Sequence, residues 1–455
     1  MSRLVVVSNR VALPGESAPG GLAVGLQAAL AARGGLWFGW SGKTVREDSG
    51  ALHEQGEGGI QYVTLDLSRQ DVAAYYNGFS NRTLWPLLHF RLDLVDYARE
   101  TRAGYRRVNA LFADRLAPLL RDDDTVWIHD YHLIPLAAML RERGVGCRIG
   151  FFLHVPMPSA DIAASLPEHG QLFGALFAHD LVGFQTRRDA ERFRSYARLF
   201  GGATLVGEDG LRLPDGRSVR VGAFPIGIDA RRIASQAAAA VSKPAVRQLQ
   251  ASLSGRELAI GVDRLDYSKG LPERFRGFSR YLERHPQDRG RLTFLQIAPV
   301  SRGEVREYRL LRDQLEGIAG HINGTHADPE WTPLRYVNRN FAHATLTGFY
   351  RLAAIGVVTP LRDGMNLVAK EYVAAQDPQN PGVLLLSMFA GAAAELEQGA
   401  LLVNPYDLDG VADAFARAAA MPLAERRERW QSMMAPVARY DIHAWCEDFL
   451  ATLRS

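Results

Sequence analysis

Short apolar runs alternate with longer stretches of helical periodicity along the whole chain, which is typical of a parallel sheet with crossover helices. In the first half, each predicted strand ends at polar residues; these strands are Leu4–Val7, Thr125–Ile128, Ile149–Leu153 and Leu181–Phe184. The scheme then restarts, with predicted strands at Leu258–Val262, Leu292–Ile297, Gly356–Thr359, Val383–Leu386 and Leu401–Val403. Helical patterns such as Leu133–Arg143 and Arg188–Phe200 lie between strands. The pattern predicts an α/β fold with two doubly wound domains.

The restart of the pattern predicts where the domains divide. We expect a first domain over residues 1–235, a second over 236–440, and a C-terminal helix over 441–455 that packs back on the first domain. The alanine-rich segment 230–246 is the predicted joint. Ligands of doubly wound sheets bind outside the carboxyl ends of the strands, so we expect two such domains to face each other across a ligand cleft.

Composition narrows the class of protein. The 455 residues are 47% hydrophobic and 23% charged, as in an ordinary globular protein. A formal charge of +3 argues against a nucleic-acid binder with a concentrated basic face. Cys147 and Cys446 are too few for a disulfide framework or a cysteine-based zinc site. With no signal-peptide pattern and no apolar run of membrane-spanning length, we expect a cytoplasmic protein.

Lysine is rare in this chain. Only four of the 53 basic residues are lysines: Lys43, Lys243, Lys269 and Lys370. A GC-rich genome explains the drift to arginine, and lysines that persist mark places where a compact ammonium is needed. Persistence by chance is the alternative for each of them.

The segment Arg264–Gly270 reads RLDYSKG and follows a predicted strand, and Leu271-Pro272 then opens a helix. Backbone N–H groups at such a junction attract an anion, and Arg264 and Lys269 add two cations. The alternative is a solvated basic turn. We favour a phosphate site.

The segment Pro360–Glu371 reads PLRDGMNLVAKE and has the same strand-to-helix form. Asp363 and Glu371 suit vicinal sugar hydroxyls, since each carboxylate accepts two hydrogen bonds. Taken alone, the segment is better explained by an N-cap at Asp363 and a surface pair of Glu371 with Lys370.

Other features are weaker when taken singly. The pair Gly20-Gly21 can let backbone approach a diphosphate or give a flexible loop. Trp37, Trp40, Tyr76 and Trp85 suit stacking on a sugar, although core packing explains each one better. The run Asp122-Asp123-Asp124 suggests a divalent metal, but it precedes a strand and so lies at the wrong sheet edge; we interpret it as a turn.

Taken together, the motifs resemble a known family in order and spacing. They are LVVVSNR, GGLWFGW, Trp85-Pro86, WIHDYHL, FFLHVPMP, RLDYSKG and PLRDGMNLVAKEYVAAQ. This set is similar to trehalose-6-phosphate synthases, which are retaining glycosyltransferases with two facing Rossmann-like domains of the GT-B type. The resemblance covers essentially the whole chain.

The resemblance implies a role for each motif residue. Donor-binding residues would be Gly20, Gly21, Arg264, Lys269, Phe341, Leu367, Val368 and Glu371. Acceptor-binding residues would be Arg10, Tyr76, Trp85, Asp130 and Arg302. His154 and Asp363 would contact the transferred glucose, and together with Arg264 and Lys269 they form the predicted catalytic set. No metal and no cofactor is expected.

The implied reaction transfers glucose from UDP-glucose to glucose 6-phosphate with retention, giving α,α-trehalose 6-phosphate and UDP. Such chemistry needs positioning and charge stabilisation of the leaving diphosphate more than a protein base. Two alternatives stay open: a related transferase with another phosphorylated acceptor or an ADP- or GDP-glucose donor, and a catalytically silent sugar-nucleotide sensor. A homo-oligomer follows only from the family.

Overall fold

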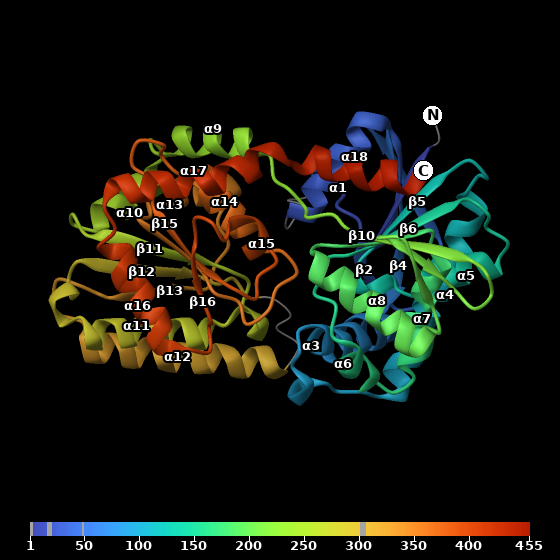
Figure 1. Ribbon diagram of the computed structural model, residues 1–455, viewed down its shortest axis with the longest axis horizontal. Helices are drawn as coiled ribbons and strands as arrows, with labels where there is room; N and C mark the ends of the chain where they lie inside the picture. Colours follow the sequence, from blue (N-terminus) through green and yellow to red (C-terminus); the bar gives the residue numbers. More distant parts are fainter. Residues whose placement is uncertain (1–2, 16–20, 48–49, 301–305) are drawn as a thin grey trace. The chain divides into compact units, whose positions relative to one another are not determined.

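The computed structural model describes residues 3–15, 21–47, 50–300 and 306–455. The chain forms two compact units: the first comprises Met1–Ile226 with Ile442–Ser455, and the second comprises Gly227–Asp441. Each unit is built around its own largely parallel sheet, and Figure 1 follows the chain through both by colour. The predicted α/β class with two doubly wound domains is confirmed.

The sheet of the first unit has ten strands in the order β3-β4-β2-β1-β5-β6-β7-β10-β9-β8. Its central strands are parallel, and the antiparallel pairs are β3 with β4, β8 with β9, and β9 with β10. The bounds are β1 Leu4–Arg10, β2 Gly35–Val45, β3 Leu52–Glu57, β4 Ile60–Ser68, β5 Thr125–His129, β6 Arg148–Leu153, β7 Leu181–Phe184, β8 Thr204–Val206, β9 Gly210–Arg212 and β10 Ser218–Ala223.

Helices cover both faces of this sheet. The α-helices are α1 Gly21–Arg33, α2 Arg69–Asp71, α3 Trp85–Leu88, α4 Arg99–Leu116, α5 Leu136–Glu142, α6 Ala160–Ala164, α7 His169–Gly174, α8 Arg187–Gly201 and α18 Ile442–Arg454. A π-helical segment, η1, spans Val72–Leu84, and short 3-10 turns are η2 Leu92–Leu94, η3 Ala117–Leu119, η4 Tyr131–Leu133 and η5 Ala175–Ala178. Phe112 of α4 packs edge-on against Phe38 of β2 at 5.6 Å between ring centroids.

Helix α18 fits closely onto the sheet because glycines leave room for it. A Cβ at Gly150 of β6 would lie 2.8 Å from Leu453, and one at Gly183 of β7 would lie 2.6 Å from Phe449. Phe449 also stacks on Trp127 of β5, with centroids 4.6 Å apart and planes at 13°. The helix that closes this core is therefore separated in sequence from the strands it covers by the whole second unit.

The second unit has a six-stranded parallel sheet in the order β13-β12-β11-β14-β15-β16. Figure 1 shows α11, α12 and α16 on one side of it and α9, α10, α13, α14 and α17 on the other. The strands are β11 Glu257–Val262, β12 Leu292–Ile297, β13 Leu334–Val337, β14 Ile355–Val358, β15 Val383–Ser387 and β16 Leu401–Val403. The helices are α9 Ala230–Ala240, α10 Pro244–Ser252, α11 Leu271–Arg284, α12 Arg306–His326, α13 His343–Leu352, α14 Leu367–Ala375, α15 Ala393–Leu396, α16 Leu408–Ala419 and α17 Leu423–Arg439, with 3-10 turns η6 Tyr267–Lys269 and η7 Pro286–Asp288.

Every strand predicted from the sequence is present, with bounds that differ by up to three residues. The predicted joint over 230–246 is wrong, because this segment forms α9 and the start of α10, and buried Ile233 and Ala237 lie on one face of α9. Its alanines are therefore helix formers rather than a flexible connection. Among the described residues, no helix combines the length and apolarity needed to cross a membrane.

Candidate active site in two halves

Four neighbouring parallel strands of the first unit place polar residues at one sheet edge. β1, β5, β6 and β7 lie side by side in the sheet, and at or just after their carboxyl ends stand Arg10, Asp130, His154 and Gln185. The chain order reverses between β1 and β5, since β2 lies on one side of β1 and β5 on the other. Such a reversal is where ligands of doubly wound sheets bind.

Asp130 is held in a backbone conformation that non-glycine residues rarely adopt, with φ 73° and ψ 167°. Its N–H donates to the Phe152 carbonyl at 2.8 Å, and its Oδ1 accepts from the backbone N–H of His154 at 3.2 Å. Strain of this kind persists only where surrounding bonds enforce it, and it clusters at functional sites. The carboxylate is thus fixed between the ends of β5 and β6.

The guanidinium of Arg10 lies against the backbone of Gly42. A Cβ at Gly42 would stand 2.6 Å from Arg10 Nε, and Gly42 also has φ +85°, so only glycine fits this place without a shift. Arg10 is exposed at the end of β1. Next to it, Asn9 accepts a 2.8 Å hydrogen bond from the Tyr75 hydroxyl.

Aromatic side chains near this edge fall into two groups. Tyr76, on the π-helical segment, stacks on His132 with centroids 5.8 Å apart and planes at 17°, and it lies 5.8 Å from the Trp40 ring. π-helical turns are rare and occur often at functional sites. Trp37 and Trp85 are buried, at 1% and 5% exposure, so the packing explanation holds for Trp37, whose Nε1 donates to the Ser8 hydroxyl.

His154 has a hydrogen-bond neighbour at each ring nitrogen. Its Nε2 lies 3.0 Å from Nδ1 of His129, and its Nδ1 lies 3.3 Å from Nε2 of Gln185. Burial lowers the pKa of His154 to about 3, so the ring is neutral at ordinary pH. Neither His129 nor Gln185 was among the predicted site residues, although both directly follow predicted strands.

The second unit repeats this arrangement at the reversal between β11 and β14. Lys269 follows β11 and Asp363 follows β14, and the Lys269 ammonium lies 2.5 Å from Asp363 Oδ2. The same oxygen accepts from Asn366 Nδ2 at 3.0 Å. The predicted N-cap at Asp363 is wrong: Asn366 caps α14, with φ 81° and its side chain accepting from the Ala369 N–H.

A buried arginine that was not predicted as a site residue forms hydrogen bonds at this edge of the sheet. Arg274 of α11 is 1% exposed and donates to Asp263 at 2.6 Å, to Gln296 at 2.8 Å and to the Thr359 hydroxyl at 2.9 Å. It also donates to the Lys269 carbonyl at 3.3 Å. One guanidinium therefore ties together the ends of β11, β12 and β14. Its signal in the sequence was slight, because it is one arginine among many.

The first turn of α14 carries the predicted nucleotide contacts. Leu367 and Val368 are its first two residues, where backbone N–H groups have no acceptor within the helix. Glu371 lies 3.5 Å from His343 Nε2, and this carboxylate raises the pKa of His343. The predicted surface pair of Glu371 with Lys370 is wrong: Lys370 is 1% exposed and lies 2.6 Å from Glu395.

The remaining predicted donor residues are more open. Arg264 is exposed just after β11. Phe341 is half-buried, packs edge-on against Phe349 at 5.3 Å and lies under the Arg339 guanidinium at 4.6 Å. An aromatic ring with an accessible face can contact a planar base.

Comparison with known proteins identifies the family. The model of Glycosyltransferase family 20 matches residues 7–455. The chain belongs to glycosyltransferase family 20. The trehalose-6-phosphate synthase of Sinorhizobium fredii is 52% identical over 459 residues, covering 100% of this chain and 98% of that protein.

Solved structures of trehalose-phosphate synthases are similar to this chain over its whole length. An α,α-trehalose-phosphate synthase (UDP-forming) from Burkholderia vietnamiensis is 51% identical with a TM-score of 0.98, covering 100% of this chain and 97% of that one. The enzyme from Burkholderia xenovorans, in complex with glucose-6-phosphate, is 48% identical with a TM-score of 0.96, and both chains are covered in full. The resemblance drawn from the motifs is confirmed.

Two residues of the predicted family 20 site, Gly20 and Arg302, lie outside the described residues, and Gly21 is the first residue of α1. The triple-aspartate run forms the turn before β5, and Asp124 pairs with Arg3 at 2.6 Å. Within the described ranges, no group of three or more His, Cys, Asp and Glu side chains is arranged to hold a metal ion. The metal-free reaction stays a prediction.

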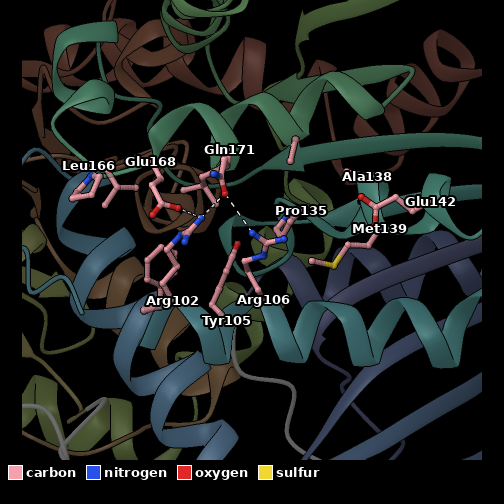
Figure 2. Close-up of a pocket in the computed structure, with 14 residues that line it drawn as sticks. Arg102, Tyr105, Arg106, Pro135, Ala138, Met139, Glu142, Leu166, Glu168 and Gln171 are labelled. Carbon is pink, nitrogen blue, oxygen red and sulfur yellow. Dashed lines mark hydrogen bonds and ion pairs between the residues drawn. The ribbon is translucent and has the colours of Figure 1, made fainter. Parts of the chain in front are cut away.

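A cavity of about 320 Å³ lies in the first unit of this family 20 protein (Figure 2). Its walls come from α4, α5 and the segment around α7, and no predicted site residue lines it. Gln171 accepts from Arg102 at 2.6 Å and from Arg106 at 3.3 Å, and Arg102 also pairs with Glu168. These contacts bind α4 to α7 and point to a structural role.

Proposed function

We propose that this chain is an α,α-trehalose-phosphate synthase that transfers glucose from UDP-glucose to glucose 6-phosphate with retention. The observation that carries the proposal is the pair of residue sets at the carboxyl edges of the two sheets. Each set stands at the reversal of strand order, and each holds charged and hydroxyl-binding side chains in fixed positions. Membership in family 20, together with the similarity to the Burkholderia xenovorans synthase that was solved with glucose-6-phosphate, supports the acceptor.

The first unit supplies the acceptor set. Arg10 offers a planar guanidinium for the 6-phosphate. Arg302, which belongs to the second unit, is proposed as a further acceptor-binding residue. Asp130 offers carboxylate oxygens for sugar hydroxyls, and Tyr76 and Trp85 give the aromatic surface that sugar rings prefer. The strained backbone of Asp130 supports this role, because it orients the carboxylate before the sugar arrives.

The second unit supplies the donor set. Arg264 and Lys269 are proposed to bind the diphosphate, Leu367 and Val368 to offer backbone N–H groups, and Glu371 to accept from the ribose hydroxyls. Phe341 is proposed to lie beside the uracil. Gly20 and Gly21, which belong to the first unit, are proposed as further donor-binding residues. His154 and Asp363 are proposed to contact the transferred glucose.

The bond changes require charge stabilisation at the leaving group. The bond between glucose C1 and the diphosphate oxygen breaks, C1 bonds to the anomeric oxygen of glucose 6-phosphate, and the acceptor proton passes to the leaving phosphate. Negative charge grows on the diphosphate as the bond breaks, and the Lys269 ammonium stabilises it. Asp363 holds that ammonium in place beforehand.

A product assay tests the proposal. Purified protein with UDP-glucose and glucose 6-phosphate should yield UDP and a phosphorylated disaccharide whose two anomeric protons are both α by NMR. Replacing UDP-glucose by ADP- or GDP-glucose, or the acceptor by another hexose phosphate, should give lower rates. Faster turnover with one of those substrates would favour the related transferase, and no turnover with any would favour the sensor. A homo-oligomer acting in the cytoplasm is part of the proposal.

A further inference from the structure

A chain of hydrogen bonds runs from the backbone through His154 into the core of the first unit. It begins at the Ile226 N–H, which donates to Gln185 Oε1 at 2.9 Å. Gln185 Nε2 lies 3.3 Å from His154 Nδ1, and His154 Nε2 lies 3.0 Å from His129 Nδ1. Gln185 and His129 are buried, at 3% and 1% exposure.

The direction of every bond in this chain follows from its first donor. A backbone N–H only donates, so the Gln185 amide must turn its oxygen toward Ile226 and its NH₂ group toward His154. His154 Nδ1 then accepts, which leaves the single proton of the neutral ring on Nε2. That N–H donates to His129 Nδ1, and the His129 proton consequently stands on its own Nε2.

The reverse direction is excluded by the same contacts. A proton on His154 Nδ1 would face the NH₂ group of Gln185, and turning the amide would place that NH₂ against the Ile226 N–H. Either arrangement leaves two donors pointing at each other in a buried place, which costs the desolvation of both. Burial also disfavours a doubly protonated ring, consistent with the lowered pKa values of His154 and His129.

The last nitrogen of this hydrogen-bond chain is left without a partner among the described residues, which costs its desolvation. Within the part of the chain that the structure describes, His129 Nε2 is buried with no hydrogen-bond partner. The His129 ring instead packs beside Trp127, with centroids 4.5 Å apart. An unsatisfied buried N–H is rare, and one that persists calls for an explanation such as a functional role. Replacing His129 by an apolar residue would remove this cost, but it would also remove the acceptor of His154.

We propose that Gln185 and His129 are positioning residues that hold His154 as the neutral ring protonated on Nε2, with its orientation fixed. This inference rests on the proposed function in one respect, namely that His154 contacts the transferred glucose. A ring so held presents one donor N–H in a set direction, and a sugar hydroxyl can take that donor only by competing with His129. The pair thereby sets which sugar geometry the ring accepts.

The test is the position of the His154 proton, read directly. Ring-15N-labelled histidine distinguishes the two neutral forms, since protonated and bare nitrogens differ widely in chemical shift; His154→Asn and His129→Asn assign the signals. In the wild type, His154 should be protonated on Nε2. His179 gives an internal control, because its Nδ1 faces the Leu176 carbonyl at 3.0 Å and must carry a proton.

Gln185→Glu is the decisive variant because it keeps the shape of the side chain, replaces the NH₂ donor by an oxygen acceptor and adds a carboxyl group. One carboxylate oxygen still accepts from the backbone, and the other accepts a hydrogen bond from His154 Nδ1, so the Nδ1 signal of His154 should move to that of a protonated nitrogen while the signals of His179 stay. kcat should fall by roughly tenfold or more, which corresponds to ~1.4 kcal/mol, with the Kd of UDP unchanged because UDP carries no glucose. His129→Asn retains an acceptor near Nδ1 and should stay within a few-fold of wild-type kcat, whereas His129→Leu should not.

Each outcome decides the matter. His154 protonated on Nδ1 in the wild type, or a Gln185→Glu variant with unchanged signals, overturns the assignment of the proton; unchanged turnover in that variant overturns the positioning role. Loss of UDP affinity in parallel with kcat reveals general damage and also overturns positioning. If Gln185→Glu does not fold, Gln185→Met removes the donor without a charge, and the form protonated on Nδ1 should become populated. A wild type with the predicted proton but no synthase activity refutes the proposed function and leaves the proton assignment standing.

Discussion

Removing the Lys269 ammonium should cost more than the loss of one ligand contact, because the same group neutralises Asp363. A charge-assisted hydrogen bond to the diphosphate contributes ~1.5–3 kcal/mol, so Lys269→Ala should lower kcat/KM by roughly 10- to 150-fold. The ammonium also lies 2.5 Å from Asp363 Oδ2, and both side chains are mostly buried. Without it, this carboxylate repels an incoming phosphate, and two unit charges about 4 Å apart at a protein surface interact by ~4 kcal/mol.

A double-mutant cycle separates the two contributions. Asp363→Asn removes the repelling charge, so its cost should be smaller in the Lys269→Ala background than in the wild type, with a coupling of ~1–3 kcal/mol. The measurements are initial rates of UDP release and the Kd of UDP by calorimetry. Lys243→Ala, a lysine of the same unit outside the predicted site, is the matched control and should behave as wild type. Additive costs would refute the coupling, and wild-type kinetics for Lys269→Ala would remove RLDYSKG from the donor site.

Four further outcomes follow from the structure. Arg274→Met leaves a buried carboxylate without its guanidinium and should destabilise the protein by ~3–5 kcal/mol, seen as a lower Tm, whereas Arg280→Met on the exposed face of the same helix should leave the Tm nearly unchanged. Gly42→Ala should raise the KM for glucose 6-phosphate by displacing the guanidinium at the end of β1, and Gly59→Ala, with a similar φ of +81° and no atom within 4 Å of its Cβ, should not. Burial lowers the pKa of His179 from 6.5 to about 3. Between these pH values the unfolded chain binds a proton that the folded chain does not, so the free energy of unfolding falls as the pH decreases from about 6.5. In denaturant titrations, His179→Asn should reduce that fall by up to ~1.4 kcal/mol per pH unit. Turnover should persist in excess EDTA, and a complete, magnesium-reversible loss would contradict the metal-free reaction.

The nine predicted strands could be recognised because a buried parallel strand needs a continuous apolar run, and such runs are visible in the sequence. Among the described residues, the strands that were not predicted are β2, β3, β4, β8, β9, β10 and β13. One of them, β2, contains the GLWFGW sequence, which was noted for its aromatics. Its glycines obscure the strand pattern in the sequence, yet the structure requires them. A Cβ at Gly35 would lie 2.3 Å from the Leu4 carbonyl oxygen, and one at Gly39 would lie 2.1 Å from the Ser8 carbonyl oxygen. Glycine normally argues against a strand, and only the approach of β1 explains it here.

The sequence predicted which motifs lie at the strand ends, but not which side chains contact one another there. The side chains expected at the strand ends stand there, because parallel strands bring their carboxyl ends to one edge whatever the details of packing. Partner choice depends on three-dimensional geometry. Lys370 and Glu371 are neighbours in sequence, yet one is buried against Glu395 and the other lies near His343, since successive helical residues point in different directions.

The order in which the chain is synthesised determines how long the surface that α18 covers stays exposed. Residues 442–454 emerge from the ribosome after the entire second unit, so that unit has all its strands while the first still lacks one helix. Until α18 arrives, Trp127 and the glycine-lined surface of β6 and β7 have no cover from it. The first half of the nascent chain therefore exposes an apolar surface while the 215 residues of the second unit are synthesised. At roughly 5–20 residues per second, that exposure lasts on the order of 10 to 40 seconds, long enough for a chaperone to bind it.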